Sequence, residues 1–246
     1  MQILKCKQFL IDFLNTGGMI ELSEKRGHLM YYAVIGEMLF SEKPDNQEKI
    51  REDLMRTLEY INTYYKEDIA SDLVPTEEGK FCGFFYTGRH VLEILDIIQF
   101  RFRKIPIRFG VGIGEMLTAL LFSGENVAGP AYEYAKKALS RLQYENDYQV
   151  SRILVMADTH EDSLSFLNES LHMCDFVQQR WKSLQSMIME ITILKTGYAE
   201  PPKQTELADI FKTSKQNINR AVRGMGYHQY IRTKREMQKL FCRYWG

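Results

Sequence analysis

The chain of 246 residues has few of the residues from which cross-linked or metal-held folds are built. Its four cysteines, at positions 6, 82, 174 and 242, are far apart and form no C-x-x-C pair. This spacing argues against a disulfide framework and a zinc site, and it predicts a reducing, cytoplasmic environment. The five histidines show no metal-ligand spacing either.

Long apolar runs are also missing. A membrane-spanning helix needs about 18 or more consecutive apolar residues, and the chain has no such run. Lys5, Lys7 and Asp12 interrupt the beginning of the chain, which therefore does not resemble a signal peptide. No Walker A, G-x-S-x-G or H-E-x-x-H motif is present. These absences exclude several enzyme classes and predict no membrane partner.

Net charge is zero, but its distribution is uneven. Residues 201–246 contain ten Lys or Arg and three Asp or Glu, which leaves 22 basic and 29 acidic residues in the first 200. A basic tail on an acidic body is typical of a nucleic-acid-binding module joined to a domain that does not bind nucleic acid. The alternative is a solvated basic face.

Apolar periodicity divides the chain into strands and helices. It predicts strands at 30–36, 69–76, 81–86, 106–113 and 151–157, and helices at 2–14, 47–67, 91–102, 130–142 and 162–196. From the first strand on, the order begins strand, helix, strand, strand, helix, strand, which is the split βαβ arrangement. The fold class expected is α/β (α+β), with helices covering a mixed, ferredoxin-like sheet.

Breaks in these patterns suggest domain boundaries. Gly197 and Pro201-Pro202 break the helical pattern of residues 162–196. We therefore expect an α/β domain at 30–158, connecting helices at 159–198 and an all-α domain at 199–246. Residues 1–29 are an N-terminal extension in one interpretation. In the other they lie upstream of a natural start at Met30, because codons for residues 24–27 can be purine-rich like a ribosome-binding site.

Residues 204–223 fit a helix-turn-helix. Ala208 is small enough for two helices to cross closely, and Ser214 stands where the second helix needs an N-cap. The turn carries Lys212 where glycine is usual. The predicted DNA-binding residues are Ser214, Lys215, Gln216, Asn217, Asn219, Arg220 and Arg223. Their amide and cationic groups can contact base edges and phosphates of double-stranded DNA.

Two further observations bear on this interpretation. No acidic residue occurs from 210 to 235, which favours DNA over an ordinary helical hairpin, the alternative. Helix-turn-helix proteins usually bind paired half-sites as dimers, so a homodimer is implied.

Several segments resemble the SatD family of bacterial proteins. They are Tyr31–Met38, Lys66–Ser71, Ile107–Glu115, Gly129–Tyr132 and the terminal helix-turn-helix. The resemblance covers about residues 30–230 and implies a body similar to class III nucleotide cyclases joined to a DNA-binding tail. It carries over no established activity.

Cyclase chemistry needs carboxylates that hold Mg²⁺ against a triphosphate. Family members resemble Ile-Ile-Gly-Asp after the first strand and Gly-Asp-Glu-Phe-Gln-Gly in the hairpin, whereas this chain has Glu37 and then Glu78-Gly79-Lys80-Phe81-Cys82-Gly83. The hairpin aspartate is replaced by Gly79, so we predict no catalytic residues. Glu37 and Glu78 are weak metal candidates, and Mg²⁺ is expected only if the chain is an enzyme.

A nucleotide remains a possible ligand of the body. The candidate nucleotide-binding residues are Glu37, Glu78, Lys80, Arg108, Gly112, Gly114 and Glu115. Three roles are open for Lys80: it contacts a phosphate, it neutralises Glu37, or it is a solvated lysine at the tip of the hairpin. The glycines fit either a close ligand approach or tight packing.

Three functions follow from these patterns. The first is a cytosolic DNA-binding regulator whose cyclase-like body, without catalysis, senses a ligand or dimerises. The second is a metal-dependent nucleotide cyclase or nucleotidyltransferase. The third is a structural interaction protein of phage defence or a mobile element.

Overall fold

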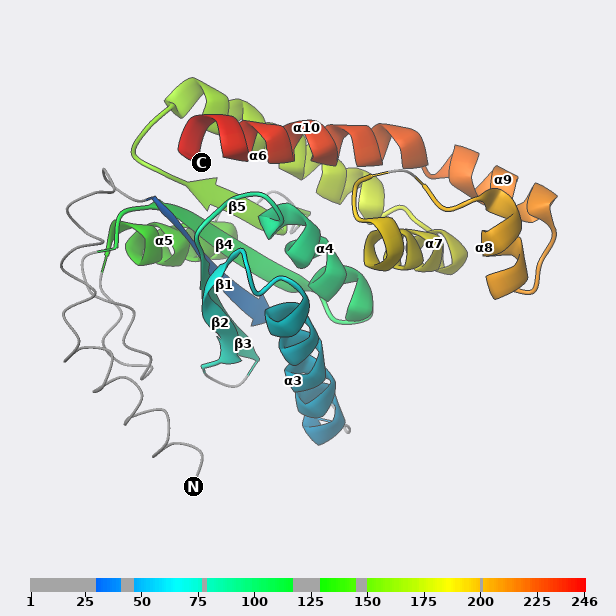
Figure 1. Ribbon diagram of the computed structural model, residues 1–246, viewed down its shortest axis with the longest axis horizontal. Coiled ribbons are helices and arrows are strands. Elements are labelled where there is room, and N and C mark those ends of the chain that lie inside the picture. Colours follow the sequence, from blue (N-terminus) through cyan, green and yellow to red (C-terminus); the bar gives the residue numbers. More distant parts are fainter. Residues whose placement is uncertain (1–29, 41–46, 77–78, 117–128, 145–149, 200) are drawn as a thin grey trace.

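The computed structural model describes residues 30–40, 47–76, 79–116, 129–144, 150–199 and 201–246. This part of the chain is a mixed α/β protein with one five-stranded sheet and eight helices (Figure 1). The strands are β1 (Tyr31–Met38), β2 (Ile69–Pro75), β3 (Lys80–Phe85), β4 (Ile107–Gly114) and β5 (Ile153–Met156). The helices are α3 (Gln47–Tyr64), α4 (Val91–Arg101), α5 (Pro130–Tyr144), α6 (Glu161–Gln178), α7 (Ser183–Thr196), α8 (Gln204–Ile210), α9 (Lys215–Gly224) and α10 (Tyr227–Trp245). The predicted helix at 2–14 lies outside the described residues.

The sheet has the strand order β2-β3-β1-β4-β5. β1 occupies the centre and pairs antiparallel with β3 and β4, while β5 extends the sheet parallel to β4. From β1 to β4 the elements follow the predicted order of strand, helix, strand, strand, helix, strand. The register places Glu37 between Lys80 on β3 and Arg108 on β4.

Helices cover both faces of the sheet, which explains why its central strands are nearly continuous apolar runs. Side chains alternate between the faces along a strand. On one face, Ala33 and Ile35 pack with apolar residues of α5. On the other face, Tyr32 and Val34 belong to a larger core with α3 and α4, which contribute Leu58, Ile61, Ile94 and Ile98.

The helical stretch predicted over 162–196 consists of two helices, α6 and α7. The break falls at Trp181, whose indole ring stacks on Phe100 and whose Nε1 donates to the carbonyl of Met225 at 2.8 Å. Gln185 then closes the first turn of α7 by accepting the Lys182 amide at 2.8 Å. Periodicity missed the break because both helices keep an apolar stripe toward the same core.

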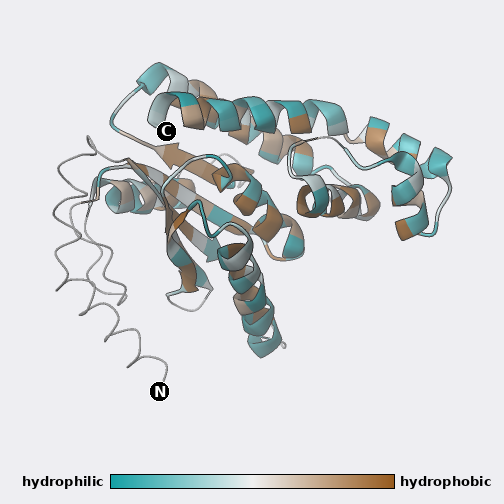
Figure 2. Cartoon of the chain, in the orientation of Figure 1, coloured by the Kyte–Doolittle hydropathy of each residue, from teal (hydrophilic) through white to brown (hydrophobic). Residues whose placement is uncertain are grey.

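The C-terminal helices pack on the body, and α10 lies beside α6 (Figure 1). Apolar side chains of α8, α9 and α10 join those of the sheet in one core cluster. Apolar residues gather on the strands, α4 and α7, whereas α8 and α9 are mostly hydrophilic on the outside (Figure 2). Among the described helices, none is both long and apolar enough to cross a membrane.

Candidate nucleic-acid interface

Two short helices, α8 and α9, form the outer end of the C-terminal region (Figure 1). Leu207 and Ala208 of α8 are buried together with Ile218 and Val222 of α9. The apolar positions of α9 are four residues apart, so they face one side and leave the other side to polar residues. The pair is therefore held by a narrow apolar contact, with one face of α9 turned outward.

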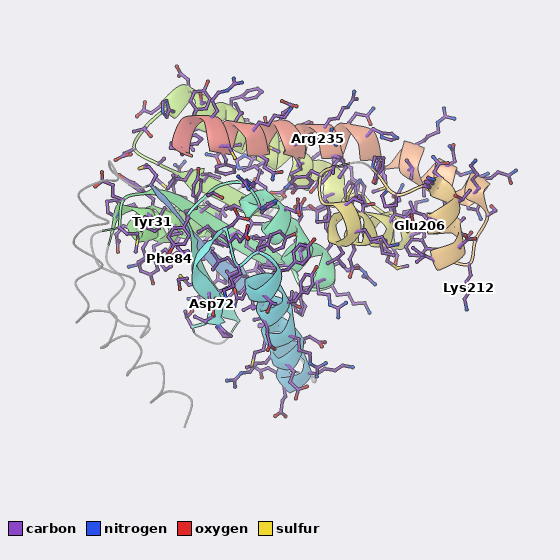
Figure 3. All side chains as sticks on the ribbon, in the orientation of Figure 1. Tyr31, Asp72, Phe84, Glu206, Lys212 and Arg235 are labelled. Atoms are coloured by element: carbon purple, nitrogen blue, oxygen red, sulfur yellow. The ribbon has the colours of Figure 1, made fainter. Side chains whose placement is uncertain are left out.

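The start of α9 is set by its cap. Ser214 is extended, and its hydroxyl accepts the backbone amide of Asn217 at 3.2 Å, as expected of an N-cap. Lys212 in the preceding turn has a φ of +48°, in the left-handed region. This is the backbone conformation that glycine adopts most easily, and here a lysine adopts it. Lys212 lies at the outer end of the molecule (Figure 3).

Most of the predicted DNA-binding residues are exposed on α9. These are Ser214, Lys215, Gln216, Asn217, Arg220 and Arg223, whereas Asn219 is half-buried. Two amides are already engaged: Asn217 donates to Thr213 Oγ1 at 3.1 Å and Asn219 to Gln204 Oε1 at 3.3 Å. In the described part of the chain, no ion pair or side-chain hydrogen bond occupies Lys215, Arg220 or Arg223. Their cationic groups are thus available to an anionic partner.

Hydrogen bonds from α7 and from the segment just before it hold the C-terminal end of α9. Gln185 Nε2 donates to the carbonyl of Ala221 at 3.2 Å, and Trp181 Nε1 donates to Met225 just after the helix. The Ala221 carbonyl also accepts the Met225 amide at 3.1 Å, so Gln185 is its second donor, whereas Met225 stands just beyond the last residue of α9. These bonds orient α9 relative to the body.

The second candidate site surrounds Glu37 at one end of the central strand. Its carboxylate lies 3.8 Å from Lys80 Nζ and accepts the Gln143 amide at 3.0 Å. Arg108 is its neighbour on the other side. Cross-strand pairs of opposite charge stabilise a sheet, so the ion pair gives Glu37 and Lys80 a structural role.

The hairpin position that carries an aspartate in the family pattern is Gly79, which has a φ of +76°. A Cβ there would come within 2.9 Å of the Phe40 ring. This turn therefore requires glycine for its backbone and for space. Glu78 lies outside the described residues, and among those described no three His, Cys, Asp or Glu side chains form a metal-binding group.

The glycines of β4 are explained by helix packing. A Cβ at Gly110 would lie 2.1 Å from the carbonyl oxygen of Ala135, and one at Gly112 would lie 1.9 Å from that of Ala131. The backbone of α5 therefore rests directly on the strand, in the space where a ligand would have to approach.

The remaining candidates of the body are split between two ends of the sheet. Glu37 pairs with Arg108, whereas Tyr31 pairs with Gly114. Since Arg108 and Gly114 are six positions apart on one strand, they are separated by roughly 20 Å. Glu115 follows Gly114, so the structure places Glu37, Lys80 and Arg108 together and Gly114 and Glu115 elsewhere.

A buried polar cluster joins α4 to α10, and sequence reasoning missed it. Lys234 and Asp96 are both fully buried and form an ion pair of 2.9 Å. Tyr198 donates to Asp96 at 2.7 Å, and Tyr230 donates at 3.2 Å. One signal was present in the sequence: Lys234 interrupts the apolar stripe of Tyr230, Met237 and Phe241, where a charge must be paired to be tolerated.

The pKa values in this region reflect burial. Burial raises the pKa of Asp175 to about 7, although Lys234 acts in the opposite direction. Burial alone would lower the pKa of Lys234, but the nearby Asp96 raises it above its ordinary value. Burial also raises the pKa of the Cys174 thiol to about 11. Lys234 is therefore a charged group held by its counter-ion in the interior.

Comparison with known proteins identifies a family. The model of the SatD family matches residues 31–241 of this chain. No curated protein and no solved structure matches the chain.

Proposed function

The chain belongs to the SatD family, and we propose that it is a DNA-binding regulatory protein in which α8 and α9 form a helix-turn-helix. The observation that carries this proposal is the outward face of α9. Lys215, Arg220 and Arg223 project there from a capped helix, with no partner of their own among the described residues. A second helix that exposes cations and amides in this way suits the major groove.

The charge distribution supports the same function. Affinity for DNA comes largely from cations that neutralise phosphates. The run without acids from 210 to 235 covers α9 and the first half of α10, so no carboxylate of this stretch opposes the DNA backbone. Of the two acids of α8, Glu206 is paired with Lys195, whereas Asp209 is exposed.

For the body, we propose a nucleotide-cyclase-like, ferredoxin-like domain that acts without catalysis. The order β2-β3-β1-β4, with every neighbouring pair antiparallel, supports the split βαβ arrangement. Glu37 is engaged by Lys80 and Gln143, and Gly79 stands at the hairpin position of the second carboxylate. The pairing of Glu37 with Lys80 favours a sensing or dimerising role over the enzyme.

A homodimer completes the proposal, and α6 offers the surface for it. Phe166, Met173 and Phe176 are 67%, 61% and 41% exposed, and they share one side of the helix. Acidic Glu161 and Asp162 stand in its first turn, whereas Arg180 follows its end. Two copies of α6 packed antiparallel would bring these opposite charges together.

A Met173→Glu variant should then sediment as a monomer, whereas the unaltered chain should sediment as a dimer.

The test of DNA binding is retention on double-stranded DNA at increasing salt. We expect the logarithm of affinity to fall linearly with the logarithm of salt concentration. The variant K215A/R220A/R223A should bind more weakly, with a slope smaller by about one for each phosphate that is no longer neutralised. The matched control is K49A/K104A, which removes exposed cations of the body and should leave the slope unchanged. Equal retention of the α9 variant and the unaltered chain would refute the proposal.

A further inference from the structure

A broad groove lies where α10 meets the body. It encloses about 1190 Å³ and is bordered by the end of α3, the start of α4, the segment after α7 and the second half of α10. Arg235, labelled on α10 in Figure 3, forms part of its wall. The groove is distinct from both sites predicted from the sequence, since neither Glu37 nor any residue of α9 lines it.

The groove is rich in cations. Six Lys or Arg residues line it, against three Asp or Glu. Lys195 and Lys239 are paired with Glu206 and Glu236 at its rim. In the described part of the chain, the side chains of Lys66, Arg89 and Arg243 have no hydrogen bond or ion pair. Three cations from three separate segments thus face one space without a carboxylate partner.

Two of the three acids in the groove are occupied. Asp68 accepts from His90 Nδ1 at 2.6 Å and from the Thr87 hydroxyl at 2.8 Å. Glu93 accepts the Tyr65 hydroxyl at 2.7 Å, and burial raises its pKa. The third acid, Glu67, is an exposed carboxylate. The field in the groove therefore favours an anion.

An aromatic ring borders the cations. Tyr64 is 67% exposed in the groove wall, and its ring stacks on Tyr60 with centroids 5.6 Å apart. A tyrosine ring supported from behind in this way offers a flat surface on which a base can stack. A nucleotide carries both a phosphate and a flat base, joined through its sugar.

We propose that this groove binds a nucleotide, with its phosphates held by Arg89, Arg243 and Lys66 and its base on Tyr64. Arg89 comes from the body and Arg243 from α10, so the bound phosphates would join the two. That junction already has direct contacts: Gln238 donates to the Arg89 carbonyl, and Arg235 donates to the Tyr198 carbonyl at 2.7 Å. The ligand adds to these contacts and tightens the attachment of α10.

Nucleotide binding in this groove is independent of the proposed function, because none of the groove residues belongs to α9. Where α9 does bind DNA, the ligand has a consequence. Only Met225 and Gly226 separate α9 from α10, so the ligand would act on the helix that carries the DNA-binding pair.

The test is calorimetric titration of the full chain with ATP, GTP and inorganic pyrophosphate. We expect at least one nucleotide to bind. The variant R89A/R243A should bind it about tenfold or more weakly, because at least one charge-assisted hydrogen bond is lost. The control K49A/K104A should bind like the unaltered chain. Tyr64→Ala should weaken the binding of the nucleotide and leave the binding of pyrophosphate unchanged. As a second measurement, the nucleotide should slow thiol modification at Cys242, which is exposed in the groove.

Three outcomes would overturn the inference. The first is the absence of binding heat and of Cys242 protection with every probe. The second is nucleotide binding to R89A/R243A with unaltered affinity. The third is a loss of DNA retention by R89A/R243A without nucleotide, since the cations would then belong to a DNA contact. The variant K215A/R220A/R223A separates the two proposals, because it should lose DNA and keep the nucleotide.

Discussion

At the scale of single residues, a left-handed backbone conformation explains why glycine stands at some positions of the chain. Gly79 and Gly226 have φ values of +76° and +67°, which glycine adopts without cost. Lys212 adopts nearly the same conformation with a side chain, in the turn before α9. Lys212 therefore has a strained backbone conformation, and no packing contact among the described residues explains it.

Lys212→Gly tests this strain. Relief of the left-handed conformation outweighs the greater freedom of glycine in the unfolded chain, so the free energy of unfolding should rise by up to about 1 kcal/mol. Gly226→Ala is the matched opposite: a Cβ there meets nothing within 4 Å, so the loss of stability would be conformational. Urea denaturation measures both. A destabilised Lys212→Gly variant would show that the side chain contributes more than the strain costs.

Asp175 makes stability depend on pH. Burial raises its pKa from 3.8 in the unfolded chain to about 7 in the folded one. Between these values the folded chain binds more protons than the unfolded chain, so stability falls as the pH rises through this window. Asp175→Asn removes this dependence. Relative to the unaltered chain, the variant should therefore be more stable at about pH 8 than at about pH 5. A relative stability that is equal at both pH values would contradict the assignment.

At the scale of elements, α5 and β4 depend on each other. The strand has glycine wherever the helix backbone touches it, and Ala131 and Ala135 keep the helix side small. The G-x-G-x-G run is therefore a helix-packing surface, and its resemblance to a ligand-binding loop comes from the same physical cause, which is close approach of a backbone.

Gly112→Ala should disrupt this packing. Its Cβ would lie 1.9 Å from the Ala131 carbonyl oxygen, so helix and strand must separate. We expect a loss of about 3 kcal/mol or more, as for other severe overpacking in a core. The control is Gly224→Ala, where the nearest atom is the flexible end of Gln185 at 3.4 Å. Thermal unfolding compares the two, and equal melting temperatures would refute the packing role of Gly112.

At the scale of the whole molecule, the C-terminal helices share their core with the sheet. Lys234 and Asp96 pair across this contact, and Tyr32 donates to the Phe241 carbonyl at 3.1 Å. Removing one partner of a buried pair leaves an uncompensated charge, which costs about 3–5 kcal/mol. The domain boundary predicted at residue 199 therefore stays a prediction. Apolar residues on both sides of it belong to one core.

A shared core predicts cooperative unfolding. Trp181 and Trp245 are the only two tryptophans, and both report on the C-terminal helices, whereas far-ultraviolet circular dichroism reports on the whole chain. The two signals should change together in urea, with one midpoint. Two separate midpoints would show that the helices of residues 199–246 unfold independently of the sheet.

The sequence by itself determined the family and most of the elements. Apolar periodicity depends on neighbours along the chain, so it located the strands and helices from β1 to β5, and the capping preference of serine located the cap at Ser214. The tertiary structure alone decided which residues meet. It showed that Glu37 pairs with Lys80, that α5 packs on the glycines of β4, that Trp181 lies at the break between α6 and α7, and that Lys234 reaches Asp96 from 138 positions away. Such contacts depend on how elements pack in space, which no local pattern records.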